Sequence, residues 1–377
     1  MRYDPGLAGF SAGETRFERI MKRIHIDIPL FAGLVTLSGV ALVILYSASA
    51  QSFDVLLRQG IRLLLAMAVM LAIAQIHPRH FRFYSPLLWG VGVLLLAAVL
   101  VMGEIGKGAQ RWLDLGVVRF QPSEILKLAV PMTVAWYLSE CPVPPAFRHV
   151  AVAGVFIAIP VGLIAKQPDL GTAILVGAAG AVAVFLAGIR WLYLLVLGGA
   201  GAGLLPVVWH FLHDYQRDRV LMFLNPEADA LGRGYHIIQS KIAIGSGGFY
   251  GKGWLQGSQA QLEFLPEKST DFIFAVVAEE FGLLGCLGLL AIYLFIIGRC
   301  IHISLQAQDA YTRLLSGALT LTFFVYVFVN TGMVVGILPV VGVPLPLVSY
   351  GGTSMVTLLA GFGILMSVQT HRKLLPG

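Results

Sequence analysis

Long runs of apolar residues alternate with short polar segments along the whole chain. A helix needs about 20 apolar residues to cross the ~30 Å hydrocarbon core of a bilayer, and runs of that length recur. The pattern predicts ten spanning helices, near residues 28–48, 59–76, 86–103, 122–139, 149–165, 172–189, 192–211, 275–298, 313–335 and 351–369. We therefore expect an all-α polytopic membrane protein with one ten-helix domain over 28–369, and a long loop at 212–274 between the seventh and eighth helices.

Composition supports a membrane protein and excludes several other classes. Hydrophobic residues make up 57% of the chain and charged residues only 12%, whereas an average soluble domain has roughly 25% charged residues. The net charge of +6 is spread between apolar runs, which does not indicate nucleic-acid binding. The three cysteines form no CxxC pair, so the sequence predicts neither a disulfide framework nor a metal ribbon.

The positions of Lys and Arg in the connections predict the orientation, because these residues gather on the cytoplasmic side of membrane proteins. One side holds thirteen, at positions 2, 16, 19, 22, 23, 79, 82, 148, 190, 299, 313, 372 and 373. The short connections of the other side hold five, at positions 58, 107, 111, 119 and 166, and the rule discounts the long loop. With ten spans, both termini are therefore expected to be cytoplasmic.

Both terminal segments are consistent with this orientation. Within residues 1–27, the stretch 14–25 places apolar side chains at i, i+3, i+4 and i+7 with basic side chains opposite. That spacing predicts a short amphipathic helix on an anionic membrane surface, and a plain extension of the first span is the alternative. Residues 370–377 are expected to form a short cytoplasmic tail.

Three ionisable residues are predicted at the outer ends of spans. Glu124 and Lys127 are three residues apart at the start of the fourth span, and hence on one helix face. Asp169 lies in a tight connection between the fifth and sixth spans, on the same side. Ionisable groups at membrane depth usually face a cavity or one another, so these residues are candidates for binding a substrate. The alternative for Glu124 and Lys127 is a purely structural ion pair.

Further cations are expected on this outer side. Lys107 and Arg111 lie beside Trp112, an aromatic residue suited to the headgroup layer, and Arg217 and Arg219 follow the seventh span. Arg and Lys bind phosphate groups through charge-assisted hydrogen bonds, so this set would suit a phosphate or pyrophosphate headgroup. The alternative is that each side chain simply extends to the membrane surface.

The long loop ends in FLPEKSTDFIFAVVAEE, residues 264–280. Ser269 or Thr270 is expected to cap the following helix, with Asp271 in its first turn, where a helix dipole favours an acid. Glu279 and Glu280 would then line a polar cavity at the outer end of that helix. A carboxylate at such a mouth is a candidate general base.

Several of these segments together resemble one known family. They are KGAQRWLDLG, QPSEILK, QPDLGT, YHIIQSKIAIGSGG, GKGWLQGSQ, FLPEKSTDFIFAVVAEE and GILPVVGVPLPLVSYGG, and they occur in order from the first span to the last. The chain resembles the shape, elongation, division and sporulation (SEDS) family, and GKGWLQGSQAQLEFLPE is more similar to its elongation members than to its division members.

The resemblance implies a ten-span peptidoglycan glycosyltransferase of the bacterial inner membrane. Such an enzyme polymerises lipid II at the periplasmic face during cell elongation, with a class B penicillin-binding transpeptidase and rod-complex proteins as partners. The family's key aspartate matches Asp271. Glu124, Lys127 and Asp169 match residues of its functionally sensitive outer cavity.

A mechanism follows from the implied substrate. The donor sugar is α-linked to a pyrophosphate and the product is β-1,4 linked, so one inverting displacement needs a base for the incoming 4-hydroxyl. Our hypothesis is that Asp271 is this base. Lys107, Arg111, Arg217 and Arg219 would hold the charge of the leaving pyrophosphate, with a divalent cation (Mg or Mn) as the alternative.

Two other functions remain open from the sequence. A lipid II flippase would also have many spans and a charged cavity, but its charges are expected near the bilayer midplane rather than at the outer ends. A non-catalytic scaffold for the transpeptidase would not need Asp271 for chemistry. The position of the charges favours the polymerase.

Overall fold

A helix lies at each position where an apolar run predicts a span. The computed structural model describes residues 24–102, 104–106, 109–114, 119–211, 217, 221–223, 234–261 and 267–372. The helices are α2 (Ile28–Ala48), α3 (Phe53–Ala74), α4 (Pro78–Met102), α5 (Pro122–Leu138), α6 (Phe147–Lys166), α7 (Leu170–Leu186), α8 (Trp191–Phe211), α12 (Ile273–Leu305), α13 (Ala310–Val335) and α14 (Thr353–Thr370). Two shorter helices, α10 (Tyr235–Gly247) and α11 (Ser258–Gln261), belong to the long loop. The largest differences from the predicted ends are at α4, which begins at Pro78 rather than near 86, and at α12, which continues to Leu305.

Most of the long helices have the length and the apolar composition needed to cross a membrane. Within the described residues, seven are both long and apolar enough to cross one: α2, α3, α4, α6, α12, α13 and α14. Their outward faces carry exposed large hydrophobic side chains, which is the arrangement expected where lipid is the solvent. The chain is therefore an integral, nearly all-helical membrane protein.

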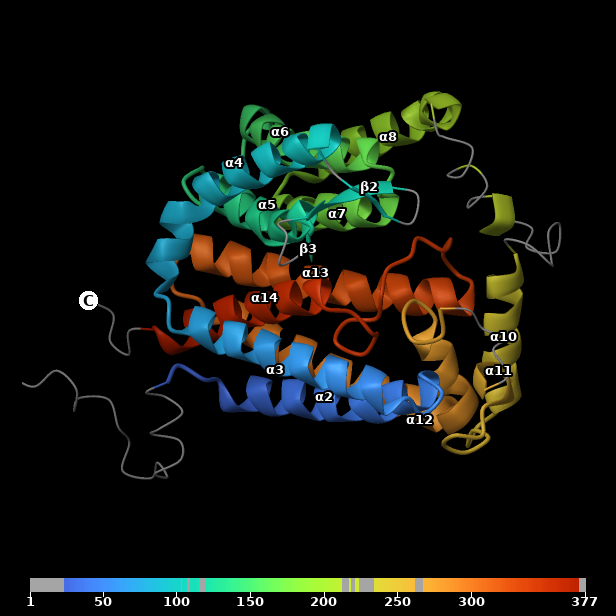
Figure 1. Ribbon diagram of the computed structural model, residues 1–377. Helices are drawn as coiled ribbons and strands as arrows, with labels where there is room; N and C mark the ends of the chain where they lie inside the picture. The colour runs from blue at the N-terminus through green and yellow to red at the C-terminus, as the bar shows by residue number, and fades with distance from the viewer. Residues whose placement is uncertain are drawn as a thin grey trace, which may run out of the picture.

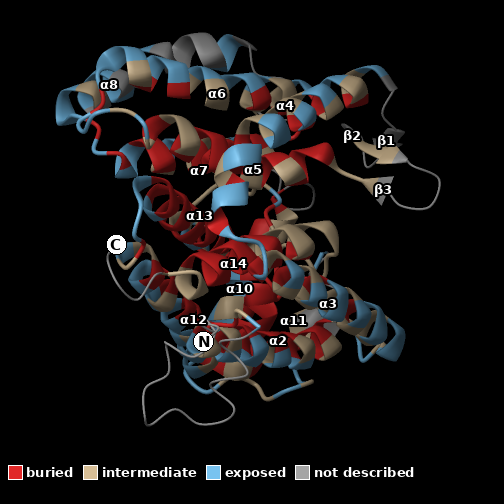
Figure 2. Cartoon of the chain, turned by 90° about the vertical axis from the view of Figure 1, so that its left-hand side faces the viewer, coloured by how far each residue is buried: buried red, intermediate tan, exposed pale blue. Residues whose placement is uncertain are grey.

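The long helices lie side by side with α13 near the centre (Figure 1). Its first half, with Leu315 and Ala318, packs into one apolar cluster with α4, α5, α6 and α7. Its second half, with Phe323 and Val327, joins a second cluster formed mainly by α2, α12 and α14. Buried residues accordingly concentrate on the central helices α13 and α14 (Figure 2). The helix α13 thus holds the two halves of the bundle together.

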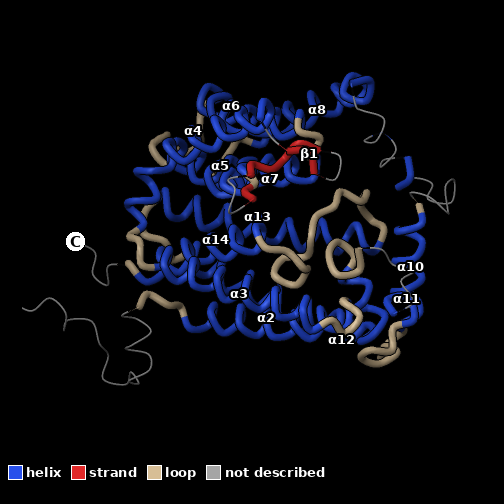
Figure 3. The backbone as a smooth tube through the Cα atoms, viewed as in Figure 1, coloured by secondary structure: helices blue, strands red, loops and turns tan. Residues whose placement is uncertain are grey.

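The two ends of the bundle differ in regularity. At one end, on the left in Figure 1, the helices join by short turns and the two ends of the described chain meet. There the His25 Nδ1 atom lies 3.1 Å from Thr370 Oγ1, and Arg299 donates to the Asp27 carboxylate at 2.6 Å. At the other end lie the irregular loops and the strands (Figure 3). We call these the turn end and the loop end.

The connection between α4 and α5, expected as a loop, contains a small antiparallel sheet at the loop end. Its strands are β1 (Glu104–Gly106), β2 (Ala109–Asp114) and β3 (Arg119–Phe120), in the order β1-β2-β3. The register pairs Glu104 with Trp112 and Leu113 with Phe120. The sheet fixes where Arg111 enters the loop end.

The helix α12 is broken at Gly282, which the apolar pattern did not indicate. Gly282 has φ +63°, a left-handed conformation that favours glycine. The break is filled by residues 248–253, whose backbone bonds both sides of it. Amide groups of Leu283 and Leu284 donate to carbonyls of 248 and 249, and carbonyls of Glu279 and Glu280 accept from amides of 252 and 253, at 3.0–3.2 Å.

We predict that Gly282→Ala destabilises the protein. A Cβ atom there would lie 2.3 Å from the Gly251 backbone nitrogen, and the backbone would keep an unfavourable φ. Strain and crowding of this kind cost roughly 1–3 kcal/mol each, so the thermal unfolding midpoint in detergent should fall. Gly288→Ala is the matched control, because a Cβ at Gly288 of the same helix meets open space. Equal midpoints for the two variants would contradict the prediction.

Candidate active site at the loop end

Asp271 lies in the turn that leads into α12. The helix begins at Ile273 with Phe272 at its N-cap, and no side chain caps it. The expectation that Ser269 or Thr270 caps the helix, with Asp271 in its first turn, is therefore wrong. The amides of Thr270 and Phe272 donate to the Glu267 carbonyl, which makes a turn. The carbonyls of residues 269–271 accept hydrogen bonds from distant segments of the fold instead of from the helix.

Those hydrogen bonds come from α13 and from the loop at 336–352. The buried Asn330 side chain donates through Nδ2 to the Asp271 carbonyl at 2.9 Å and to the Val343 carbonyl at 2.7 Å. The Ser349 hydroxyl donates to the Thr270 carbonyl at 2.5 Å. Because the carbonyls of Thr270 and Asp271 are both held in this way, the Asp271 backbone is fixed while its side chain stays partly exposed.

Gly342 lies against the Asp271 side chain. It has φ +73°, and a Cβ at this position would be 3.4 Å from the Asp271 Oδ2 atom. The loop at 336–352 therefore packs beside the carboxylate. The Ser349 hydroxyl accepts from the Leu345 amide and donates to the Thr270 carbonyl, so it joins this loop to the turn that carries Asp271.

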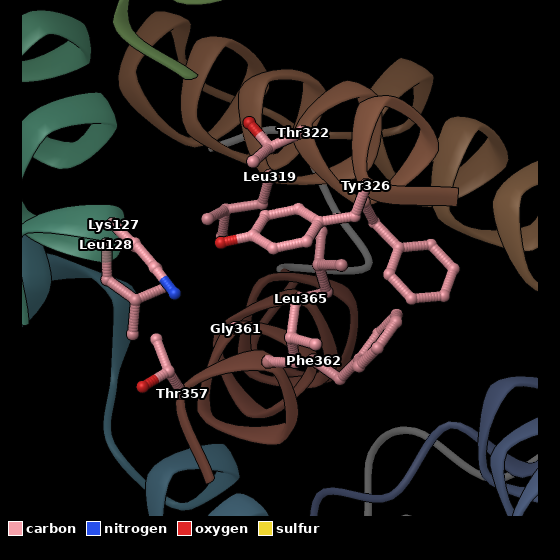
Figure 4. Close-up of a pocket in the computed structure, with 11 residues that line it drawn as sticks. Lys127, Leu128, Leu319, Thr322, Tyr326, Thr357, Gly361, Phe362 and Leu365 are labelled. Atoms are coloured by element: carbon pink, nitrogen blue, oxygen red, sulfur yellow. The ribbon is translucent and has the colours of Figure 1, made fainter. Parts of the chain in front are cut away.

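Glu124 and Lys127 form a buried ion pair. The Lys127 Nζ atom lies 2.7 Å from Glu124 Oε1 within the first turns of α5. The ammonium also lies over the ring of Tyr326 from α13, 5.6 Å from its centroid. Lys127 borders a small cavity of about 30 Å³ whose walls come from α5, α13 and α14, with Leu319, Tyr326 and Phe362 among the lining residues (Figure 4).

Asp169 caps α7 and receives an arginine from the sheet. Its carboxylate accepts from the Thr172 amide at 3.2 Å and from the Thr172 hydroxyl at 2.9 Å. The Arg111 Nε atom lies 3.7 Å from Asp169 Oδ2, and Nη2 donates to the Pro168 carbonyl at 2.8 Å. The Gln121 side chain, just before α5, reaches the same carboxylate at 3.3 Å.

The helix α13 and the loop at 336–352 bring these groups into one region. Tyr326 and Asn330 are four residues apart on α13 and so lie one above the other on one face. The Tyr326 ring contacts the Lys127 ammonium, and the Asn330 side chain donates to the Asp271 carbonyl. The same loop approaches Gly171 at the start of α7, where a Cβ would lie 2.6 Å from the Val341 carbonyl oxygen. Asp271, Asp169 and the Glu124–Lys127 pair therefore surround the loop end of α13.

The other predicted cations are placed differently or lie outside the described residues. Arg217 donates to the carbonyls of Trp209 and His210 in the last turn of α8, at 3.0 and 2.6 Å. Lys107 and Arg219 lie outside the described residues. Of these four cations, Arg111 is thus the one that the structure, within its described residues, places beside an acidic site residue.

Glu279 and Glu280, expected to line a polar cavity, are instead buried beside the break in α12. The Glu279 carboxylate accepts from Lys252 Nζ at 2.7 Å and from the Gln259 amide at 2.9 Å. The Ser47 hydroxyl of α2 donates to Glu280 at 2.5 Å. These acids stabilise the packing of residues 248–259 against α12.

Sequence reasoning missed several residues of this site. Asn330 is uncharged, and only its polarity within the apolar run VFVNTG could have indicated it. Gln59 and Arg62 lie inside α3, which begins six residues before its predicted start. Gln59 donates to the Ser349 carbonyl at 3.3 Å, and Arg62 lies 4.8 Å from the Tyr350 ring centroid. No group of three or more His, Cys, Asp or Glu in the described residues has a geometry for a metal ion.

Comparison with known proteins identifies the family. The family model described as "Cell cycle protein", covering FtsW, RodA and SpoVE, matches residues 21–374. The chain belongs to the FtsW/RodA/SpoVE family. It is 52% identical to a protein named peptidoglycan glycosyltransferase MrdB of Escherichia coli K12, over 94% of this chain and 96% of that one. It is 37% identical to a probable peptidoglycan glycosyltransferase FtsW of Geobacter metallireducens, with the same coverage of each chain.

Solved structures agree with this membership. A chain in a structure of a peptidoglycan synthase complex superposes with a TM-score of 0.80 at 34% identity, covering 92% of this chain and 99% of that one. The rod shape determining protein RodA of Thermus thermophilus gives a TM-score of 0.70 at 30% identity, covering 92% and 98%. The resemblance to the elongation members of the FtsW/RodA/SpoVE family is confirmed.

We predict that Lys127→Met destabilises the protein more than the double variant Lys127→Met/Glu124→Gln does. Removing one member of a buried ion pair leaves an uncompensated charge and costs about 3–5 kcal/mol, whereas replacing both members costs less. Thermal unfolding of both single variants and the double variant in detergent measures the coupling. Strictly additive losses would show that the pair contributes no interaction energy.

Proposed function

We propose that this protein is a peptidoglycan glycosyltransferase that polymerises lipid II into β-1,4 glycan strands. The identity of 52% to a protein of that name supports the reaction class. The observation that carries the proposal is the Asp271 carboxylate, held by its backbone to α13 and to the loop at 336–352 beside the other acidic site residues. A fixed backbone with an accessible carboxylate is what a general base needs.

The proposed reaction is a single inverting displacement. Asp271 accepts the proton of the acceptor sugar's 4-hydroxyl as its oxygen forms a bond to the donor's anomeric carbon. The bond from that carbon to the pyrophosphate oxygen breaks, and the undecaprenyl pyrophosphate leaves as an anion. Base catalysis of this kind contributes typically ~10²–10⁴-fold to the rate.

The leaving pyrophosphate requires positive charge near the acidic residues. Arg111 is supported for this role, because it is held at Asp169 by one interaction while about a third of its side chain stays exposed. Lys107, Arg217 and Arg219 remain proposals for the same role, and a divalent cation is the alternative. Lys127 is buried in its pair with Glu124, which favours positioning the site over binding the phosphate.

We propose that the loop end faces the periplasm and both termini the cytoplasm, in the bacterial inner membrane. The excess of Lys and Arg in the connections of the turn end supports this orientation. All acidic site residues gather at the loop end rather than near the middle of the helices, which favours a polymerase over a flippase.

A class B penicillin-binding transpeptidase is the proposed partner, together with rod-complex proteins. The support is the superposition, with a TM-score of 0.80, on a chain from a peptidoglycan synthase complex. Lipid II polymerisation is accordingly best measured on the complex of this protein with its transpeptidase.

The first functional test is Asp271→Asn, which keeps the side-chain shape but removes the base. Glycan strand synthesis from lipid II by the purified complex should fall by roughly 10²-fold or more. Glu267→Gln is the matched control, because Glu267 is an exposed acid in the same turn. Strand synthesis near the wild-type rate by a folded Asp271→Asn protein would disprove the base assignment, and lipid II movement across liposomes without synthesis would favour the flippase.

A second test concerns Asn330, which we assign as a positioning residue. Asn330→Ala should lower kcat about tenfold or more with little change in KM, because Asp271 would lose its fixed position while the substrate contacts remain. Thr331→Ala is the control, since the neighbouring Thr331 hydroxyl bonds only within α13 among the described residues. A loss of stability without a change in kcat would show that Asn330 has only a structural role.

A further inference from the structure

A second polar cavity lies at the turn end, at the opposite end of the bundle from Asp271. It has a volume of about 390 Å³ and opens between the α3–α4 turn, the α12–α13 turn and the end of α14. Its charged and imidazole lining residues are His77, Arg79, Arg82, Asp309, His371 and Arg372. Nothing in the proposed polymerase reaction uses these residues.

The lining carries an excess of positive charge. Three arginines face one acid, and the Asp309 carboxylate is already occupied in capping α13, where it accepts from the Thr312 amide at 2.9 Å and the Thr312 hydroxyl at 2.8 Å. Arg82 pairs with Glu140 at 3.0 Å. Its two neighbours in the cavity, Arg79 and Arg372, have no such ion pair among the residues that the structure describes.

Both of these arginines keep donors for a ligand. Arg372 donates through Nη1 to the amide oxygens of Gln306 and Gln369, and its Nη2 atom has no hydrogen-bond partner among the described residues. No carboxylate within the described part of the chain pairs with Arg79, whose side chain is exposed. Guanidinium groups with unused donors suit a phosphate group.

The surrounding histidines also favour an anion over a cation. The His371 ring stacks on His25 with centroids 3.9 Å apart and meets His77 edge-on at 5.0 Å. Burial and the neighbouring imidazoles lower the pKa of His25 and of His77, so further positive charge is disfavoured here. An anion bound in the cavity would oppose this effect.

The N-terminus of α4 adds to the preference of the cavity for an anion. This helix starts at Pro78 and its N-terminal end carries a partial positive charge, whereas the N-terminus of α13 is already capped by the Asp309 carboxylate. The bound anion would therefore meet guanidinium groups and one helix N-terminus together.

Apolar side chains beside the cavity indicate a lipid as the source of the phosphate. Phe83 follows Arg79 by four residues on α4, so the two lie on one helix face, and Phe83 is 73% exposed. Phe83 would contact acyl chains one turn deeper in the membrane than Arg79, which lies at headgroup level. A soluble phosphate would have no use for this apolar surface.

We propose that the cavity at the turn end binds the phosphate group of an anionic phospholipid. Arg79 and Arg372 hold the phosphate, and the exposed face of α4 with Phe83 contacts the acyl chains. Basic pockets between membrane helices are well suited to such headgroups, and their affinity falls with ionic strength.

The test is lipid binding by the purified full-length protein in zwitterionic detergent, measured by native mass spectrometry with phosphatidylglycerol as the probe and phosphatidylcholine as the reference. Arg79→Gln/Arg372→Gln should weaken phosphatidylglycerol binding roughly tenfold or more, since each substitution removes charge-assisted hydrogen bonds. Arg148→Gln/Arg190→Gln is the matched control, because it removes two exposed arginines from other turns at the same end, and it should bind like wild type.

A third variant raises affinity instead of lowering it, so the test does not depend on a loss. Asp309→Asn removes the cavity's acid while an asparagine can still cap α13, and phosphatidylglycerol should bind several-fold more tightly. Equal weakening in the two double-arginine variants, or no gain in Asp309→Asn, would overturn the site. Glycerol phosphate that binds as tightly as phosphatidylglycerol would overturn the lipid as its source.

Discussion

Within a bilayer, every backbone amide and carbonyl must find its partner inside the protein, and this constraint explains where the chain departs from regular helix. The break in α12 at Gly282 persists because residues 248–253 supply hydrogen bonds to both sides of it. The turn at 269–272 persists because Asn330 and Ser349 satisfy its carbonyls. Irregular backbone is therefore found where another segment of the protein covers it.

The proposed chemistry depends on these same irregular segments. If α12 extended regularly through residues 269–272, the carbonyls of Thr270 and Asp271 would be used within the helix. They would not be available to Asn330 and Ser349, and the loop at 336–352 would lose its attachment beside the carboxylate. The position of Asp271 relative to Asp169 and the Glu124–Lys127 pair is thus a consequence of the turn. The helix α13 sets the separation between Asp271 and Lys127, because it contacts both.

The sequence predicts the helices well and the site only in part, for physical reasons. Apolar runs locate the spans because a bilayer requires long uncharged helices, and the spacing of Glu124 and Lys127 predicts that they share a face. Hydropathy carries no information on backbone conformation, so the break at Gly282 was not predicted. The role of Asn330 was not predicted either, because its two carbonyl partners belong to other segments of the chain.

The predicted convergence of cations shows a further limit of reasoning from the sequence. Two arginines on the same side of a membrane can bind different groups, because each binds the nearest unsatisfied oxygen atoms. Arg111 reaches Asp169 since the small sheet carries it there, whereas Arg217 binds carbonyls at the end of its own neighbouring helix. Charge alone therefore indicates which face of the membrane a cation occupies, and the local fold decides which group it can bind.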